Sequence, residues 1–365
     1  MSLYPCFSYR KNTQRYSAIL GVAFKIASWN VAGLRALLRK TPNALSDLVN
    51  KYDLDVLCLQ ETKLQESHLD DPKLKLNGGN LIEGYDAYWS CSTAKKWHAG
   101  TAVFIKLRDT AQMKQAKMGD FFASNKNATS KVEATICTDL DSDMIQKLVP
   151  TNVSYKMGKE AHDTEGRIIT LDFPTFSLSN VYVPNSGKKL ERLTYRTQQW
   201  DKDLLSFMQT KESDRGGPVI LLGDLNVAHT NLDVWNDGAK HLAKQAGTTP
   251  EERQSFQDML DSGFVDAFRK LHPTAQGHYS YWSQRAGNRQ PNKGYRFDVS
   301  EILGVKRTVM SLIDIIGIHI LHSSQVLTNL ASIICLSHNR LSTHRSHTYS
   351  TSFAVRRALT TTGRL

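Results

Sequence analysis

Residues 219–229 read VILLGDLNVAH, and this stretch does most to decide the fold. It begins with four apolar residues in a row, which is typical of a strand buried on both faces. Asp224, Asn226 and His229 follow at the point where such a strand would leave the core. The stretch therefore predicts a central strand with polar side chains at its carboxyl end. We expect His229 to be a structural hydrogen-bonding residue.

Polar side chains also end four other predicted strands. These side chains are Asn30 after KIASW, Glu61 after VLCLQ, Tyr182 and Asn185 in NVYVPN, and Asp298 after GYRF. Any one of them is explained by the preference of Asp and Asn for turns that follow strands. Together with residues 224–226 they favour convergence on one pocket, because side chains on rigid strand ends can meet there. Their carboxylate and amide oxygens suit a hard cation such as Mg²⁺.

The order of the predicted elements indicates an α/β fold. Strand patterns occur at 24–33, 54–63, 87–92, 98–106, 167–173, 176–185, 219–224 and 294–298, and helical spacing at 190–210 and 249–264. Strands outnumber helices and fall into two sets. We therefore expect a four-layer α/β sandwich, with two mixed β-sheets face to face and helices outside.

The charge of the chain is concentrated at its two ends. The formal net charge is +11, yet residues 1–46 hold seven Lys or Arg and no acid, and residues 299–365 hold seven against two. The body between them carries 32 basic and 33 acidic residues. The basic balance therefore does not by itself indicate a DNA-binding face. The five cysteines form no CxxC and predict neither a disulfide framework nor a zinc site.

Three segments lie outside this pattern. Residues 1–24 have the composition of an organelle transit peptide, or equally of an untargeted basic leader. Residues 108–150 are polar without steady periodicity, so we expect a surface insertion. The apolar stretch within residues 308–336 is broken by Asp314 and His319, so it fails as a membrane span, and we expect no membrane association.

Eight ordered blocks between residues 25 and 298 resemble the exonuclease III type of apurinic/apyrimidinic endonuclease. They are KIASWNVAGLRA, LDVLCLQETK, HDTEGRII, NVYVPNSG, RLTYRTQQWD, VILLGDLNVAH, TPEERQSF and GYRFD. The resemblance implies Mg²⁺-dependent hydrolysis of the phosphodiester 5′ of an abasic site in duplex DNA, with 3′-phosphodiesterase or 3′–5′ exonuclease side activities. Mn²⁺ is a second metal that would serve. It also implies base excision repair by a monomer in the nucleus, or in the mitochondrion or another organelle if the leader is a transit peptide.

The resemblance also implies roles for single residues. Glu61 matches the main metal ligand, supported by Asn30, and Asp224 and Asn226 lie at the same metal and phosphate site. Asp224 matches the residue that orients or deprotonates the attacking water, and Tyr182, Asn185 and Asn226 match phosphate contacts. Asp298 matches the residue that orients a terminal histidine. An aspartate in water is too weak a base at neutral pH, so Asp224 would need neighbours that tune it.

Substrate contacts are implied as well. Tyr281, Tyr295 and Phe297 match an apolar pocket that takes the flipped-out, base-less sugar, although aromatic core packing explains them equally well. Arg167 and Lys188 match positions that touch the DNA backbone, and plain solvated surface is the alternative.

Two departures from the family pattern stand out. Ala32 occupies a position where the family has Asp or Asn beside the metal, so we expect a water in place of one ligand. After Asp298 the pattern stops at VSEILGVKRT, and the terminal Ser-Asp-His run is absent. A mistranslated exon or retained intron explains this break most economically. We expect residues 299–365 to be poorly ordered or irregularly helical and to pack little against the body.

These observations leave two hypotheses of different class. The first is an active abasic-site endonuclease. The second is a family member that binds damaged DNA but cuts poorly, because it lacks the terminal Asp-His. The C-terminal sequence distinguishes them.

Overall fold

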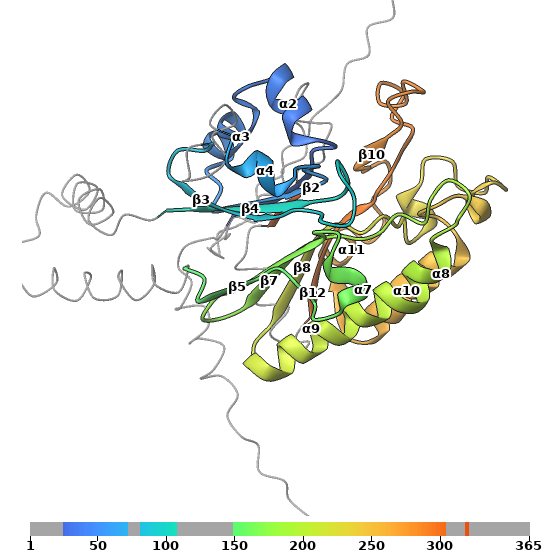
Figure 1. Cartoon of the computed structure of the whole chain (residues 1–365). Coiled ribbons are helices and arrows are strands. Elements are labelled where there is room, and N and C mark those ends of the chain that lie inside the picture. Colours follow the sequence, from blue (N-terminus) through green and yellow to red (C-terminus); the bar gives the residue numbers. More distant parts are fainter. Residues whose placement is uncertain (1–24, 72–80, 108–148, 304–317, 321–365) are drawn as a thin grey trace, which may run out of the picture.

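The computed structural model describes residues 25–71, 81–107, 149–303 and 318–320 (Figure 1). The leader 1–24, residues 108–148 of the expected insertion, and tail residues 304–317 and 321–365 lie outside the described residues. Among the helices described, none combines the length and apolar character needed to span a bilayer.

Two mixed sheets form the centre of the molecule. The first has the order β13-β1-β2-β4-β3 and the second the order β5-β6-β7-β8-β12-β9. The strands of the first are β1 (Ile26–Asn30), β2 (Val56–Gln60), β3 (Tyr85–Ser90), β4 (Thr101–Lys106) and β13 (Ile318–Ile320). Those of the second are β5 (Asn152–Ser154), β6 (Ile168–Asp172), β7 (Ser177–Tyr182), β8 (Val219–Asp224), β9 (Phe264–Asp266) and β12 (Asp298–Leu303). The short strands β10 (Tyr281–Trp282) and β11 (Gly294–Tyr295) pair antiparallel and form a separate two-stranded sheet.

Helices cover the outer face of each sheet, which confirms the predicted four-layer sandwich (Figure 1). Beside the first sheet lie α2 (Leu34–Lys40), α3 (Ala44–Tyr52) and α4 (Glu66–Leu69); beside the second lie α9 (Asp201–Arg215) and α10 (Pro250–Asp261). The shorter helices are α7 (Glu160–Asp163), α8 (Leu193–Tyr195), the π-helix η2 (Arg196–Trp200), the 3₁₀ helices η3 (Asn231–Asp233) and η4 (Leu242–Lys244), and α11 (Ala267–Leu271).

Alternating side chains of the central strands supply three hydrophobic layers. On β8, Ile220 and Leu222 pack between the sheets, whereas Val219 and Leu221 pack outward against α9 and α10. The same alternation places Cys58 of β2 in the inner layer and its neighbours against α3. Because both faces of these strands are buried, their sequences read as continuous apolar runs.

Buried polar side chains also join the two sheets near one end. Asn180 of β7 is fully buried, and its Nδ2 donates to the carbonyl oxygens of Leu59 (3.1 Å) and Ala102 (2.9 Å) in the other sheet. Its Oδ1 accepts from Nε2 of Gln60 at 2.7 Å. These contacts fix how the strand ends of one sheet face those of the other.

The expectation that the chain after Asp298 packs little against the body is wrong for residues 299–303 and 318–320. The backbone of β12 lies inside the second sheet and pairs antiparallel with both β8 and β9. The backbone of β13 pairs parallel with β1 at the edge of the first sheet. Sequence alternation gave no signal for either strand. A strand with neighbours on both sides is stabilised by its ladder and by the layers around it, so its own alternation is a weak guide.

We predict that Asn180→Ala lowers the free energy of unfolding by about 2–4 kcal/mol, because buried carbonyl and amide groups lose their partners. Urea unfolding followed by circular dichroism measures it. Asn152→Ala, which removes one hydrogen bond from an exposed asparagine at the sheet edge, is the control and should cost less than about 1 kcal/mol. Equal costs for the two variants would contradict a joining role for Asn180.

We predict that Ile302→Pro, at a position of β12 that pairs with both β8 and β9, destabilises the fold by about 3 kcal/mol or more, because proline removes a ladder donor and clashes with its neighbours. Ile320→Pro, at the end of the short edge strand β13, should cost less. Thermal unfolding of the full chain measures both. An unchanged melting temperature for Ile302→Pro would show that β12 does not pair in solution.

Candidate active site

The carboxyl ends of β1 and β2 face those of β7 and β8 across the sandwich. Asn30 ends β1, Glu61 follows β2, and Tyr182 and Asp224 end β7 and β8. Each pair of strands is parallel, so within each sheet the two ends lie at the same edge. The structure therefore brings together four of the side chains that the sequence singled out.

One amide links the two carboxylates of this cluster. Nδ2 of Asn30 donates to Oε1 of Glu61 at 3.0 Å and to Oδ2 of Asp224 at 2.7 Å. Oδ1 of Asn30 accepts from the backbone N–H of Ala32 at 2.9 Å, which fixes the direction of the amide. Two acids from different sheets are thus held beside one another by a neutral donor.

The two carboxyl groups have opposite pKa shifts. Burial alone would raise the pKa of Glu61, but hydrogen bonds from Lys63 and Asn30 outweigh burial and lower it. Nζ of Lys63 lies 2.8 Å from Oε2 of Glu61. Burial raises the pKa of Asp224 to about 6, and the charge of Glu61 acts in the same direction. Glu61 is therefore the permanent carboxylate of the pair, and Asp224 is the group that can exchange a proton near neutral pH.

Tyr182 is a neutral donor to this pair. Its hydroxyl donates to Oε1 of Glu61 at 2.9 Å. Burial, together with the charges of Glu61 and Asp224, raises the pKa of Tyr182 well above its ordinary value. Because the phenol stays protonated, Tyr182 can donate a hydrogen bond but cannot act as a phenolate base.

The turn after β8 depends on Gly223 and on hydrogen bonds within the loop. Gly223 has φ +135°, and a Cβ there would come within 2.0 Å of the carbonyl oxygen of Val181 on β7. The backbone N–H of Asn226 donates to Oδ1 of Asp224 at 2.9 Å, and Nδ2 of Asn226 donates to the carbonyl of Val183 at 2.8 Å. Nδ2 of the exposed Asn185 donates to Oδ1 of Asn226 at 3.0 Å. Asn226 thus lies beside Asp224, and Asn185 contacts Asn226.

Several non-glycine residues of the cluster have a left-handed backbone. They are Ala32 (φ 50°), Glu61 (φ 52°), Lys63 (φ 54°) and Asn226 (φ 50°). Asparagine tolerates this conformation, whereas the other residue types adopt it at a cost of about 1–2 kcal/mol each. Strain of this kind persists only where surrounding contacts impose it, and it is frequent at functional sites.

The three predicted pocket aromatics lie together. Ring centroids are 5.3 Å apart for Tyr281 and Phe297 and 5.6 Å apart for Tyr295 and Phe297. Tyr295 and Phe297 are buried in an apolar cluster, so core packing describes these two, while Tyr281 is 47% exposed. Arg296, between them in sequence, points elsewhere and pairs with Asp266. Tyr281 therefore presents the accessible ring of the set.

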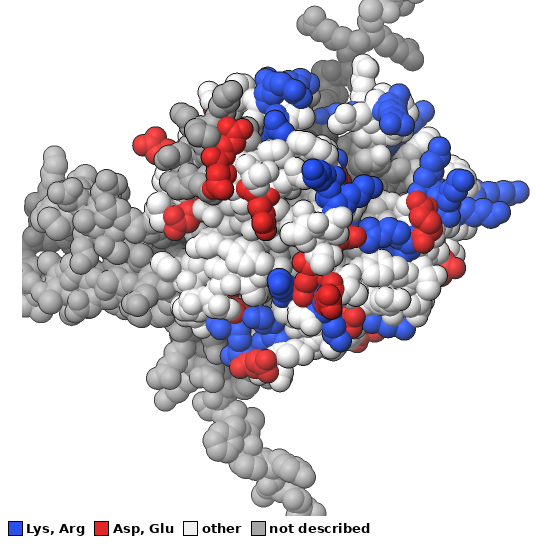
Figure 2. All heavy atoms as spheres, viewed as in Figure 1, with Lys and Arg blue, Asp and Glu red and all other residues white. Residues whose placement is uncertain are grey.

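Basic side chains flank the cluster on two elements. Helix α2 carries Arg35, Arg39 and Lys40, all exposed, and the loop after β10 carries the exposed Arg285 and Lys293; neither element contains an acid. Figure 2 shows blue side chains gathered over α2 and over the β10 loop. The basic side chains of α2 belong to the acid-free N-terminal end of the sequence, whereas those of the β10 loop belong to its charge-balanced body. Such a basic rim favours binding of a polyanion.

The described residues form no group of three or more His, Cys, Asp or Glu side chains able to hold a metal ion. Glu61 and Asp224 offer hard carboxylate oxygens instead, whereas Oδ1 of Asn30 is engaged by the N–H of Ala32. Mg²⁺ commonly binds one or two protein carboxylates and keeps several waters, so this donor set fits it. Ala32 is exposed and supplies no ligand from its side chain. Oδ1 of Asn226 is likewise engaged, by Asn185, so the two carboxylates are the most suitable of the predicted ligands.

The remaining predicted residues differ in burial and in contacts; they are Arg167, Lys188, Asp298 and His229. Arg167 is 2% exposed, so the solvated-surface alternative is wrong for it; it donates to the carbonyl of Tyr182 (3.0 Å) and lies over that ring. Lys188 is exposed. Asp298 begins β12 in register with Asp224, but its side chain lies outside the described set. His229 hydrogen-bonds Gln257 at 3.0 Å, as expected of a structural residue.

Two residues that support the site were missed. Arg196 and Glu252 are buried beneath the turn after β8 and contact each other. Both stand in the quoted blocks RLTYRTQQWD and TPEERQSF, but the sequence predicted no role for either residue. A helix-start pattern with Glu at the third position was the available signal for Glu252.

The chain is similar in sequence and in overall structure to several nucleases. The model of the Endonuclease/Exonuclease/phosphatase family matches residues 27–108. Exodeoxyribonuclease of Bacillus subtilis (strain 168) is 40% identical over 282 residues, which cover 76% of this chain and 89% of that protein. DNA repair nuclease APEX1 of Danio rerio is 38% identical over 274 residues, covering 75% and 71%. The AP endonuclease of Leishmania major superposes with a TM-score of 0.59 at 29% identity, covering 76% of this chain and 78% of that one.

We predict that Asp224→Asn stabilises the metal-free protein by about 1–3 kcal/mol at pH 8 and by much less at pH 4.5. The native pKa of Asp224 lies above its ordinary value of 3.8. The folded state therefore binds this proton more tightly than the unfolded state, and the associated stability is lost as pH rises through about 6. Asparagine has no proton to lose. Urea unfolding in EDTA at both pH values measures the difference, and an equal effect at both would contradict the raised pKa.

Proposed function

Because this chain belongs to the exonuclease III type of AP endonucleases, within the endonuclease/exonuclease/phosphatase family, we propose that it incises duplex DNA 5′ of abasic sites in base excision repair. It is an enzyme, a DNA phosphodiesterase. The observation that carries the proposal is the pair Glu61 and Asp224, held together by Nδ2 of Asn30 at 3.0 and 2.7 Å.

Each residue of this site has a different role in the proposed hydrolysis of the phosphodiester. Asp224, with a pKa of about 6, accepts a proton from the attacking water at neutral pH. In the proposed reaction the side-chain amides of Asn185 and Asn226, which contact each other, donate to phosphate oxygens, and the protonated Tyr182 hydroxyl keeps Glu61 in place. A buried base and preorganised donors lower the barrier without rearrangement during the reaction.

A divalent metal completes the proposed site. Mg²⁺ would be held by Glu61, with Asn30 and Asp224 nearby, and Mn²⁺ would serve in its place. When bound it supplies positive charge to the phosphoryl oxygens. The lowered pKa of Glu61 keeps its carboxylate charged and ready for a cation over the whole physiological pH range.

The proposed substrate contacts follow from the rim of the site. Arg35, Lys40 and Lys188 are exposed and would contact backbone phosphates. Tyr281 is half exposed and lies beside two buried rings, so it would border the base-less sugar. The proposed enzyme acts as a monomer, in the nucleus or in an organelle, and removal of 3′ blocking groups would use the same hydrolytic residues.

We predict that the full chain, with Mg²⁺, cuts a duplex carrying one abasic analogue to leave a 3′-hydroxyl, and that Glu61→Gln lowers kcat by about a hundredfold or more. Gel electrophoresis of end-labelled DNA measures cleavage, and fluorescence anisotropy in EDTA measures binding, which should stay nearly unchanged. Glu66→Gln, an exposed glutamate on α4, is the control and should behave as the unmodified chain.

Other outcomes of this assay are informative. Tight, lesion-dependent binding without cleavage by the unmodified chain would favour the alternative of a damaged-DNA-binding family member. Normal cleavage by Glu61→Gln would remove Glu61 from the site.

A further inference from the structure

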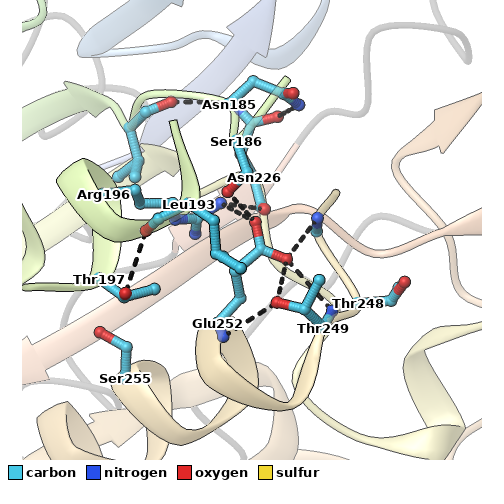
Figure 3. A network of polar contacts seen from close by, with 12 residues as sticks. Asn185, Ser186, Leu193, Arg196, Thr197, Asn226, Thr248, Thr249, Glu252 and Ser255 are labelled. Atoms are coloured by element: carbon cyan, nitrogen blue, oxygen red, sulfur yellow. Dashed lines mark hydrogen bonds and ion pairs between the residues drawn. The ribbon is translucent and has the colours of Figure 1, made fainter. Parts of the chain in front are cut away.

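Arg196 lies in the interior directly beneath the turn that carries Asp224 and Asn226. It begins the π-helical turn η2 between α8 and α9 and is only 2% exposed. Its guanidinium donates to the carbonyl oxygens of Leu225 and Asn226, both at 2.6 Å (Figure 3). The two central peptide groups of the turn are therefore held by one rigid side chain.

Glu252 holds that guanidinium from the opposite side. It is fully buried, and its Oε1 accepts from Nη1 of Arg196 at 3.1 Å and from Oγ of Ser186 at 2.5 Å. Its Oε2 accepts from the N–H of Gly247 at 2.7 Å and from Oγ1 of Thr249 at 2.9 Å (Figure 3). Thr249 and Glu252 form the capping box of α10, so this carboxylate is fixed by a helix start.

The pair joins three loops that each border the site. Ser186 follows Asn185 after β7, Leu225 and Asn226 follow β8, and Gly247 precedes α10. Nδ2 of Asn185 in turn donates to Oδ1 of Asn226, so displacement of one loop would displace the other.

A general stabilising role does not explain this arrangement well. A buried ion pair is often no more stabilising than apolar side chains of similar volume. Moreover, Nε of Arg196 has no hydrogen-bond partner, and Asp201 lies 3.7 Å from it. The fork of an arginine is well suited to hold two adjacent carbonyls and one carboxylate in fixed directions, which a lysine cannot do.

We propose that Arg196 and Glu252 are positioning residues: they hold the turn 224–226 and the loop 185–187 in the arrangement that hydrolysis requires. The inference rests on the proposed function for its kinetic consequences. Neither residue touches the reacting atoms. They act through the backbone of Leu225 and Asn226 and through Ser186.

The first test compares Arg196→Lys and Glu252→Gln with Asp172→Asn. Asp172 is equally buried and hydrogen-bonds Ser177 and Lys211, but it lies at the opposite end of the second sheet. All three variants should melt at lower temperature. Well below the lowest melting temperature, Arg196→Lys and Glu252→Gln should lower kcat on abasic DNA about a hundredfold with KM within about threefold, since small misplacement of catalytic groups has effects of this size. Asp172→Asn should leave kcat within about twofold.

The second test does not depend on activity. Amide hydrogen exchange of the full chain, followed by mass spectrometry, should show faster exchange of peptides that span 224–228 in Arg196→Lys and Glu252→Gln, while residues 219–222 stay protected. Asp172→Asn should not change exchange at 224–228. If the unmodified chain fails to cut abasic DNA, the proposed function fails, and the exchange result still decides the positioning role.

The proposal is overturned if exchange at 224–228 is unchanged in both variants. It is also overturned if kcat falls no more in them than in Asp172→Asn. Should Arg196→Lys not fold, Glu252→Gln carries the test, because the amide keeps the size of the carboxylate and the cap of α10.

Discussion

The relative position of the two sheets is the constraint on which the rest of this structure depends. No single sheet carries the site: Asn30 and Glu61 come from one, and Tyr182 and Asp224 from the other. Apolar packing between sheets fixes their separation but has little directional preference. The amide of Asn180, which donates to backbone carbonyls of the facing sheet, supplies direction, because hydrogen bonds to a backbone tolerate little sliding. The relative position of the site residues therefore depends on the hydrogen bonds of Asn180, a short distance along the strands from the site itself.

The second level of organisation is electrostatic. Glu61 and Asp224 are both acids beside one amide, yet Lys63 keeps the first ionised and burial makes the second harder to ionise. One fold thus provides a fixed charge and a proton acceptor within a single cluster. The buried Arg196 contributes a positive charge below Asp224 as well as two hydrogen bonds to its turn.

Much of this site could be predicted from sequence, because buried strands that end in polar residues have a distinct pattern. Asn30, Glu61, Tyr182 and Asp224 all meet as expected. The Arg196–Glu252 pair could not be predicted, since its partners are 56 residues apart and its main contacts are to backbone oxygens, which no side-chain pattern reveals. The strands β12 and β13 were missed because pairing, and not alternation, defines them. The sequence likewise does not reveal that the basic side chains of α2 and of the β10 loop, which are far apart along the chain, lie on the same face of the molecule.

The placement of β12 and β13 has a consequence for how the chain acquires its structure during synthesis. Among the described strands, β9 is joined to the second sheet through β12 alone, and the outer neighbour of β1 is β13, almost 300 residues later. A nascent chain that has reached residue 297 therefore exposes an unpaired edge of β8 and cannot dock β9. Such long-range pairing is slow, and open strand edges associate with other chains. Assembly of both sheets thus waits for the last described segments, and the growing chain is most prone to aggregation and most dependent on chaperones just before they emerge.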